Sequence, residues 1–425
     1  MKYKYLLLLC LAIQSVQAQW QERIIAPKVN TTRLFPVGNP LGFPIVRLGL
    51  SDQLELHFDD LDDRIKNYAY TFQLCNADWT TSMLSQFDFI KGYSQIRITN
   101  YRVSSEAFTR YIHYQASVPD RSCMPFRSGN YILKVFQDGD TSKLVFTKRF
   151  LIVNEQASIS AQILQPFSGA TFRTHQKIQL KVGLSEQLQV VNPAQQFKVV
   201  ILQNRRWDGS SREIKPSFYS RNQFEFNAEN DCIFPAGKEW RWLDLRSFRL
   251  QSDRVDGVSY QSRPVEVFVK PDMARAPQRY AFYRDMNGLY NIETIESINP
   301  VWQGDYAKVH FTFVPQDNKM FPDKEVKIIG LLNPLRDKAN AMIFDPVKGV
   351  YESTLMLKQG FYNYAYVVSD KNKPELISFD QTEGNYWETE NDYQILVYFR
   401  GLSGRADELV GFLQLNSITG RAGVK

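Results

Sequence analysis

The chain has 425 residues, of which 44% are hydrophobic and 14% are aromatic, including 22 Tyr and 29 Phe. This composition excludes a disordered chain, and the length alone predicts about three domains of ~100–150 residues each. The formal net charge of +6 is close to balanced for this length, so it does not indicate a nucleic-acid-binding protein, which needs a concentrated basic face.

The first 18 residues have the pattern of a secretory signal peptide. Lys2 and Lys4 precede an apolar run over residues 5–13, and Val16 and Ala18 stand at the −3 and −1 positions of a cleavage site. The run is too short to span a membrane, and no later stretch is apolar for long enough to do so. We therefore expect cleavage after Ala18 and a mature protein that lies outside the cytoplasm and does not itself span the membrane.

The rest of the chain is dominated by short runs with the alternation and composition of β-strands. Asp138-Gly139 separates two such runs in residues 130–153, and this dipeptide is typical of a tight hairpin. Strands at intervals of ~8–12 residues predict an all-β fold of tandem immunoglobulin-like or early-set β-sandwiches. The expected units are β-sandwiches at 25–155, 156–270 and 300–400, with a linker and hairpin at 271–299 and a partly loose C-terminal tail at 401–425.

An acidic cluster separates two strand-like runs in residues 53–79 and consists of Asp59, Asp60, Asp62 and Asp63. An EF-type calcium loop requires a glycine at its turn and a glutamate at its twelfth position, and this stretch has no such glycine. We interpret the cluster as a solvated turn between two strands. A surface loop that contacts a partner protein and a metal site are the alternatives.

Two tryptophans in KEWRWLDLRSF, Trp240 and Trp242, stand two residues apart and are therefore expected on one face of a strand. If exposed, they would stack on a sugar or anchor a partner protein. We expect instead that both pack in the core, with Arg241 pointing outward.

Three cysteines remain after the signal peptide, Cys75, Cys123 and Cys232. Because the number is odd, they cannot all pair within one chain. A disulfide between Cys75 and Cys123 inside the first unit is one interpretation, and buried free thiols are the other.

The motifs of common enzymes and metal sites are absent from the sequence. The four histidines lie far apart, and neither H-E-x-x-H nor C-x-x-C occurs. There is no G-x-S-x-G elbow, no phosphate-binding P-loop and no G-x-G-x-x-G turn. We therefore expect no catalytic residues, no metal, no cofactor and no small-molecule substrate, although a carboxylate pair set by the fold alone would escape this kind of inspection.

The third unit resembles the β-sandwich module at the front of glycogen-branching enzymes. Gly330, Asn333, Gly360, Tyr362 and Tyr364 fit the pattern of that module. Pro334 and Leu335 stand where the module has a tryptophan. The resemblance implies a β-sandwich, but the aromatic ring that stacks on glucose is missing.

The whole mature chain also resembles the plug proteins of the bacterial type IX secretion system of the Bacteroidetes. The blocks that carry this resemblance are QLELHFDDLDDRIKNYAYTFQLCNADW, SGNYILKVFQDGD, FKVVILQNRRWD, YRDMNGLY, LKQGFYNY and TENDYQILVYFR. The resemblance implies a non-enzymatic periplasmic protein, peripheral at the outer membrane. Such a protein closes the periplasmic opening of a giant outer-membrane β-barrel translocon when no cargo is engaged.

A second function remains open on the residues themselves. The early-set likeness and the paired tryptophans favour an extracytoplasmic glycan-binding accessory protein as the alternative. Under either interpretation the residues expected to contact a partner are the four aspartates and the two tryptophans.

Overall fold

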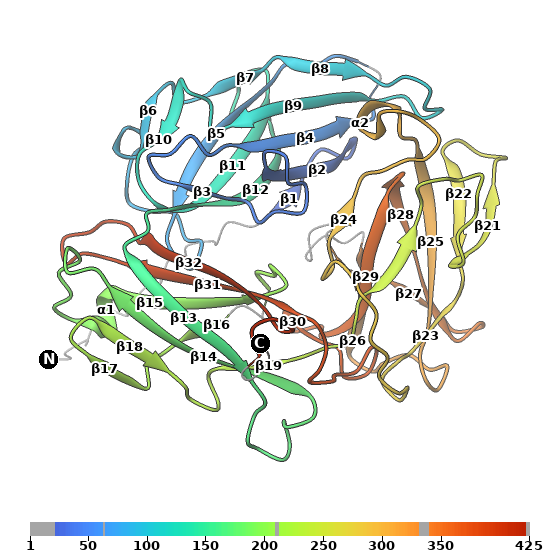
Figure 1. Ribbon diagram of the computed structural model, residues 1–425. Helices are drawn as coiled ribbons and strands as arrows, with labels where there is room; N and C mark the ends of the chain where they lie inside the picture. The colour runs from blue at the N-terminus through green and yellow to red at the C-terminus, as the bar shows by residue number, and fades with distance from the viewer. Residues whose placement is uncertain (1–21, 63, 209–211, 331–339, 422–425) are drawn as a thin grey trace, which may run out of the picture.

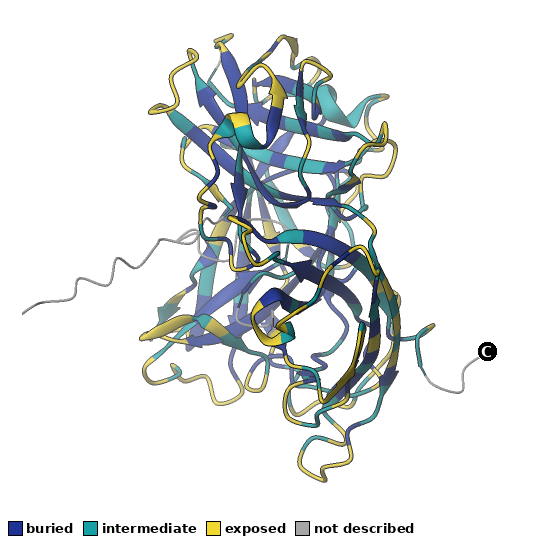
Figure 2. Ribbon diagram, turned by 90° about the vertical axis from the view of Figure 1, so that its left-hand side faces the viewer, coloured by how far each residue is buried: buried dark blue, intermediate teal, exposed yellow. Residues whose placement is uncertain are grey.

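The computed structural model describes residues 22–62, 64–208, 212–330 and 340–421, and these form an all-β molecule of three β-sandwiches (Figure 1). The predicted fold class is therefore confirmed. Buried residues lie mainly along the strands, and exposed residues lie mainly in the loops and turns (Figure 2). The signal peptide and Asp63 lie outside the described residues.

The first sandwich is built from strands between residues 23 and 153. Its larger sheet has the order β1-β12-β11-β5-β7, with β3 added parallel to β12, and its smaller sheet has the order β2-β4-β9-β8. A short pair, β10-β6, and a 3-10 turn, η1, lie beside them. The bounds are β1 Arg23–Ile24, β2 Val29–Pro36, β3 Ile45–Arg47, β4 Leu54–Asp60, β5 Tyr68–Cys75, η1 Gln86–Asp88, β6 Ile90–Gly92, β7 Ile96–Ile98, β8 Asn100–Val103, β9 Ile112–Val118, β10 Cys123–Pro125, β11 Gly129–Gln137 and β12 Leu144–Val153.

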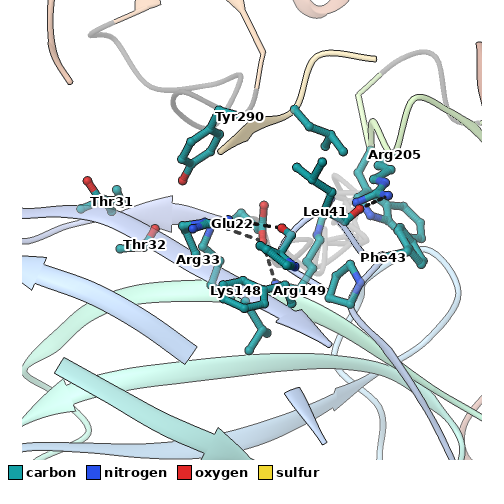
Figure 3. Close-up of a pocket in the computed structure, with 18 residues that line it drawn as sticks. Glu22, Thr31, Thr32, Arg33, Leu41, Phe43, Lys148, Arg149, Arg205 and Tyr290 are labelled. Atoms are coloured by element: carbon teal, nitrogen blue, oxygen red, sulfur yellow. Dashed lines mark hydrogen bonds and ion pairs between the residues drawn. The ribbon is translucent and has the colours of Figure 1, made fainter. Parts of the chain in front are cut away.

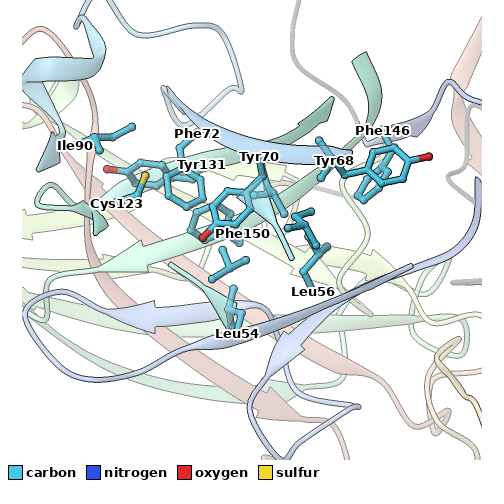
Figure 4. Close-up of a cluster of buried hydrophobic side chains, with 14 of the residues drawn as sticks. Leu54, Leu56, Tyr68, Tyr70, Phe72, Ile90, Cys123, Tyr131, Phe146 and Phe150 are labelled. Atoms are coloured by element: carbon cyan, nitrogen blue, oxygen red, sulfur yellow. The ribbon is translucent and has the colours of Figure 1, made fainter. Parts of the chain in front are cut away.

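The core of this sandwich follows from the two-residue period of its strands. Leu54, Leu56 and Phe58 of β4 point inward and are fully buried, among the aromatic rings contributed by β5, β11 and β12 (Figure 4). The predicted hairpin joins β11 to β12. Asp138 and Gly139 both have positive φ, 58° and 72°, as the two central residues of a type I′ turn require, and the Asp140 amide donates to the Gln137 carbonyl. The whole connection is longer, since β12 begins at Leu144.

The second sandwich takes strands from two distant parts of the chain. One sheet has the order β13-β14-β18-β17 with β19 added to β14, and the other has the order β16-β15-β31-β32. A single-turn helix, α1, precedes β15. The bounds are β13 Ala157–Leu164, β14 His175–Leu184, α1 Pro193–Gln196, β15 Phe197–Gln203, β16 Arg212–Ile214, β17 Phe218–Ser220, β18 Gln223–Phe226, β19 Ile233–Pro235, β31 Asp392–Phe399 and β32 Glu408–Asn416.

The third sandwich is inserted into the second one, between β19 and β31. One sheet is built on β29, which pairs with β20, β24, β26 and β30, and the other has the order β21-β22-β25-β28-β27 with β23 added parallel to β25. The bounds are β20 Arg241–Asp244, β21 Val255–Ser259, β22 Val265–Val269, β23 Asp272–Met273, β24 Tyr290–Asn291, α2 Pro300–Gln303, β25 Tyr306–Val314, β26 Lys324–Ile329, β27 Ile343–Asp345, β28 Val350–Lys358, β29 Phe361–Asp370 and β30 Lys373–Ser378.

This insertion places several strands differently from the units expected from the sequence. Strands β20, β21 and β22 fall within the expected second unit of 156–270 but belong to the third sandwich. There β20 pairs with β29, β22 pairs with β25, and β21 pairs with β22. Strand β31, expected in the third unit, pairs with β15 of the second. The prediction of a partly loose tail at 401–425 is wrong for β32, which pairs along the length of β31 and buries Leu409 and Val410.

The hairpin expected in residues 280–295 is a turn that leads into one short strand. Asn287 and Gly288 have positive φ, 52° and 82°, but only β24 follows, and it pairs with β29. A Cβ atom at position 288 would lie 2.8 Å from the ring of Trp240, so glycine is required there by space as well as by backbone conformation.

The first and second sandwiches pack through an apolar contact between two sheets. Cys75, Ile132 and Leu151 from the outer face of the larger first sheet meet Leu202 and Leu396 of β15 and β31. Strands β5 and β11 are consequently buried on both faces, which explains why their apolar runs are nearly continuous instead of alternating.

Candidate functional site

The first and third sandwiches meet through a buried ion pair centred on Asp59, whose side chain is 1% exposed. One carboxylate oxygen accepts a hydrogen bond from Lys358 Nζ at 2.6 Å and another from the Tyr306 hydroxyl at 2.6 Å. The other oxygen lies 2.6 Å from His113 Nδ1. Asp59 and His113 belong to β4 and β9 of the first sandwich, whereas Lys358 and Tyr306 belong to β28 and β25 of the third.

The interpretation of Asp59 and Asp60 as a solvated turn is therefore wrong. Both residues end strand β4, and they are 1% and 0% exposed. Asp60 accepts hydrogen bonds from the Tyr68 hydroxyl and the Asp62 backbone amide, and its Oδ2 lies 2.8 Å from Lys66 Nζ. Of the described members of the cluster, only Asp62 retains substantial exposure, at 46% of its side chain.

The network continues along the face of β4 that is turned away from the first core. Glu55, His57 and Asp59 are two residues apart and share this face. His57 Nδ1 lies 3.0 Å from His113 Nε2, and His57 Nε2 lies 3.1 Å from Glu55 Oε2. Burial and the neighbouring charge of His113 lower the pKa of His57 to about 4, so His57 is neutral at neutral pH.

Asp59 and Lys358 form a fully hydrogen-bonded ion pair. Burial opposes ionisation of Asp59, but the charge of Lys358 and the hydrogen bond with His113 outweigh it and hold the pKa of Asp59 below its ordinary value. Lys358 also donates to the Val301 carbonyl at 2.6 Å, and its ammonium lies 4.1 Å from the centre of the Tyr111 ring. Because both oxygens of Asp59 already accept hydrogen bonds, we interpret this network as an interdomain clamp rather than as a catalytic group.

A second contact fixes the same two sandwiches beside α2. The carboxylate of Asp305 accepts hydrogen bonds from the backbone amides of Phe108 and Thr109, at 3.1 and 2.9 Å. The Tyr111 hydroxyl donates to the Gly304 carbonyl at 2.8 Å. The loop before β9 is therefore held on the third sandwich by directional bonds.

The paired tryptophans do not share one environment. Trp240 is 4% exposed and packs with Phe379, whereas Trp242 is partly exposed and stacks parallel to Phe361 at a centroid distance of 6.3 Å. Trp240 therefore has no free ring face for a sugar. The expected core packing is right for Trp240.

The expected outward orientation of Arg241 is wrong, because Arg241 is 4% exposed. Its guanidinium binds Asp272 at 2.8 Å and Glu383 at 2.9 Å, and Arg275 binds the second oxygen of Glu383 at 2.6 Å. These charges lower the pKa of Glu383 to about 2 in spite of its burial. The network ties β20 to the segment that leads back into the second sandwich.

The disulfide considered between Cys75 and Cys123 is not formed, and both residues are buried thiols. Cys232 is buried as well. Cys75 lies in the contact with the second sandwich, whereas Cys123 lies in the first core. Burial raises the pKa of each of these two thiols to about 12.

A cavity of about 140 Å³ lies where all three sandwiches meet (Figure 3). The first sandwich contributes most of its lining, the second contributes Arg205 and Trp207, and the third contributes Leu289 and Tyr290. The sequence patterns single out none of these residues, because they come from six separate segments. No group of three His, Cys, Asp or Glu side chains suited to a metal ion occurs among the described residues.

The residues of the early-set pattern have structural roles in the third sandwich. A Cβ atom at Gly330 or Gly360 would lie 2.4 Å from a backbone oxygen, that of Asn363 or Asn291, so both positions require glycine. Tyr362 and Tyr364 are buried, and their hydroxyls donate to the Lys358 carbonyl and to Asp272. Asn333, Pro334 and Leu335 lie outside the described residues.

Comparison with known proteins identifies one domain and one similar structure. Residues 29–154, which correspond to the first sandwich, match the family model of the type 9 secretion system plug protein first domain. The crystal structure of a hypothetical protein from Parabacteroides merdae is similar over 94% of this chain and 100% of that chain, with 27% sequence identity and a TM-score of 0.89. No curated protein matches.

The match and the fold agree on the kind of protein this is. Within the part of the chain that the structure describes, the helices are too short and too polar to cross a membrane. The family model matches only the first sandwich, whereas the similar solved structure extends over all three sandwiches. The first sandwich belongs to the type 9 secretion system plug protein first-domain family.

Proposed function

We propose that this protein is a non-enzymatic periplasmic subunit that binds the periplasmic opening of the outer-membrane β-barrel translocon of the type IX system and closes it when no cargo is engaged. The observation that carries the proposal is the match of residues 29–154 to the first plug domain. The signal-peptide pattern of residues 1–18 supports export and cleavage after Ala18.

The architecture suits a rigid protein that closes an opening. The first sandwich contacts the second through the apolar contact of β5 and β11 with β15 and β31, and it contacts the third through the Asp59 clamp. The two segments that connect the second and third sandwiches are hydrogen-bonded to each other, from the Tyr386 amide to the Gly237 carbonyl. Close-packed β cores resist compression. We expect that contacts on two sides of the first sandwich also restrict rotation of the sandwiches relative to one another. A reversible seal also requires an interface of modest area and partly polar character.

Binding to the translocon is tested by affinity purification of the full chain with a C-terminal tag. Outer membranes are solubilised in mild detergent, and the proteins that co-purify are identified and quantified. We expect one very large outer-membrane β-barrel protein in near-stoichiometric amount. Recovery of the tagged chain alone, from cells that express the barrel, would contradict the proposal.

Closure is tested separately, by the permeability of cells that lack the gene. Entry of a large solute that the outer membrane normally excludes is expected to rise in the deletion strain and to return to normal when the gene is restored. A double deletion of the plug and barrel genes is the control, because it should show no such leak. Unchanged permeability in the single deletion would contradict closure while leaving binding intact.

A further inference from the structure

The cavity at the meeting point of the three sandwiches has a strongly cationic lining. Its basic residues are Arg33, Lys148, Arg149 and Arg205, and the only carboxylate in its lining is that of Glu22. Glu22 lies 3.8 Å from Lys148 and accepts the Arg149 backbone amide at 3.0 Å. The only acidic group of the lining is therefore already engaged at one side of the cavity.

Two of these arginines, Arg33 and Arg205, form no salt bridge among the described residues, although the charge of Asp392 acts on Arg205. Arg33 donates to the Pro40 carbonyl at 3.3 Å and lies over the rings of Phe35 and Tyr290. Arg205 donates to the adjacent Leu41 carbonyl at 2.5 Å and lies 5.8 Å from the centre of the Phe43 ring. Each guanidinium donates a hydrogen bond to a neutral carbonyl oxygen, whereas a guanidinium carries five N–H donors.

For the partly buried guanidinium of Arg205, such an arrangement is costly without an anion. Burial of a guanidinium removes its hydration, and backbone carbonyls and ring faces replace only part of it. Burial accordingly lowers the pKa of Arg205 to about 10.

We propose that this cavity binds an anion composed of a carboxylate and a small apolar or aromatic group, with Arg33 and Arg205 holding the carboxylate. The guanidinium fork matches a carboxylate in shape and charge. The remaining lining favours an apolar body, since it includes Phe35, Phe43 and Leu289. The proposal rests on the residues that line the cavity and not on the proposed function.

The volume restricts the apolar part of the ligand. At about 140 Å³, the cavity is comparable to an engineered cavity of about 150 Å³ that accepts benzene. A ligand of this kind is either a free organic acid or the end of a peptide whose last side chain is aromatic. The shared chemistry is an aromatic ring one or two carbons from a carboxylate.

The proposal is tested by isothermal titration of the purified mature chain with 3-phenylpropionate, with its neutral analogue 3-phenylpropanol and with inorganic phosphate. We expect 3-phenylpropionate to bind and the alcohol to bind at least tenfold more weakly. The affinity for 3-phenylpropionate should fall as the salt concentration rises. Tighter binding of phosphate than of 3-phenylpropionate, or equal binding of the acid and the alcohol, would overturn the proposal. A tetrapeptide ending in Phe, with a free or an amidated C-terminus, distinguishes a peptide end from a free acid.

Variants locate the binding in the cavity. We expect the affinity for 3-phenylpropionate to fall at least tenfold in Arg205→Met and in Arg33→Gln. Leu289→Trp should block binding, because the larger side chain fills the apolar part of the cavity and leaves the charges in place. Arg121→Met, at an exposed arginine outside the cavity, is the matched control and should bind normally. Urea unfolding of each variant identifies any that fails to fold. Unchanged affinity in folded Arg33→Gln and Leu289→Trp would overturn the assignment.

Discussion

The first sandwich contacts its two neighbours by different physical means. Its contact with the second sandwich is built from apolar side chains such as Ile132, Leu151 and Leu396. Its contact with the third is built around the buried charges of Asp59 and Lys358 and around the carboxylate of Asp305. One contact resembles the interior of a domain, whereas the other resembles a buried polar network.

The difference indicates different contributions to the molecule. Apolar burial is non-directional and scales with area, so the first contact stabilises the pair without strictly fixing its orientation. The ion pair contributes little net stability, because the cost of desolvation offsets the attraction between the charges. Removal of one partner lowers the stability strongly, because it leaves the other charge buried and unpaired. We infer that the ionic contact sets the position of the third sandwich and that the apolar contact supplies adhesion.

The largest effect is expected for Lys358→Met, which leaves Asp59 buried without its cation. The free energy of unfolding should fall by about 4 kcal/mol, measured by urea denaturation at pH 7. Lys348→Met is the matched control, because the Lys348 side chain is 59% exposed, and it should change little.

A double variant tests whether the loss of stability comes from the unpaired charge of Asp59. Asp59→Asn combined with Lys358→Met removes both charges and should recover much of the loss, giving a coupling energy well above that of an exposed pair. If the two single effects simply add, the clamp interpretation is incorrect.

At the apolar contact, Leu396→Ala should lower the free energy of unfolding by about 3 kcal/mol, because a fully buried leucine leaves a cavity between two sheets. The same denaturation measurement applies. Leu376→Ala, at a leucine that is 50% exposed, serves as the control. An effect equal to that of the control would show that the two sheets do not remain packed in solution.

The ionic contact should also respond to acid. Folded His57 has a pKa of about 4, whereas an unfolded histidine titrates near 6.5. Between these values the unfolded chain binds more protons, so stability falls as pH falls, by about 2 kcal/mol from pH 7 to pH 5. Glu55, His113 and Arg33 are the ionisable groups that influence His57.

The acid effect is measured as a difference, because a buried acid elsewhere acts in the opposite direction. Burial raises the pKa of Glu239 to about 7, so the folded state takes up a proton there as pH falls and is stabilised. His57→Gln should therefore lose the His57 contribution and become relatively more stable than the wild type at pH 5. Parallel stability profiles for the two proteins between pH 7 and pH 5 would contradict this assignment.

The smallest effect is expected for the exposed ion pair between Arg127 and Glu408, which also joins the first and second sandwiches. The two groups lie 3.3 Å apart and each side chain is 40% exposed. Arg127→Gln should lower the free energy of unfolding by about 0.5 kcal/mol or less, and this difference should disappear at high salt concentration. A loss comparable to that of Leu396→Ala would mean that charge also dominates the first contact.

Local sequence signals were sufficient to predict the fold class and several of its turns. Alternation in LELHF and the Asp138-Gly139 dipeptide act over a few residues, and the structure has the strand and the hairpin that they predict. The plug-family resemblance was also detectable, because it depends on blocks of residues that do not require the fold to be known.

Only the tertiary structure determined which strands share a sheet and which polar residues are buried. The pairing of β31 with β15 joins residues nearly two hundred positions apart, and no local pattern encodes such a partner. Asp59 has the sequence surroundings of a turn, yet it is buried because Lys358, from another sandwich, supplies its counter-charge. Arg33 and Arg205 likewise become one site only where the three sandwiches meet. Burial and charge pairing depend on distances in space, and these exist only after the chain has folded.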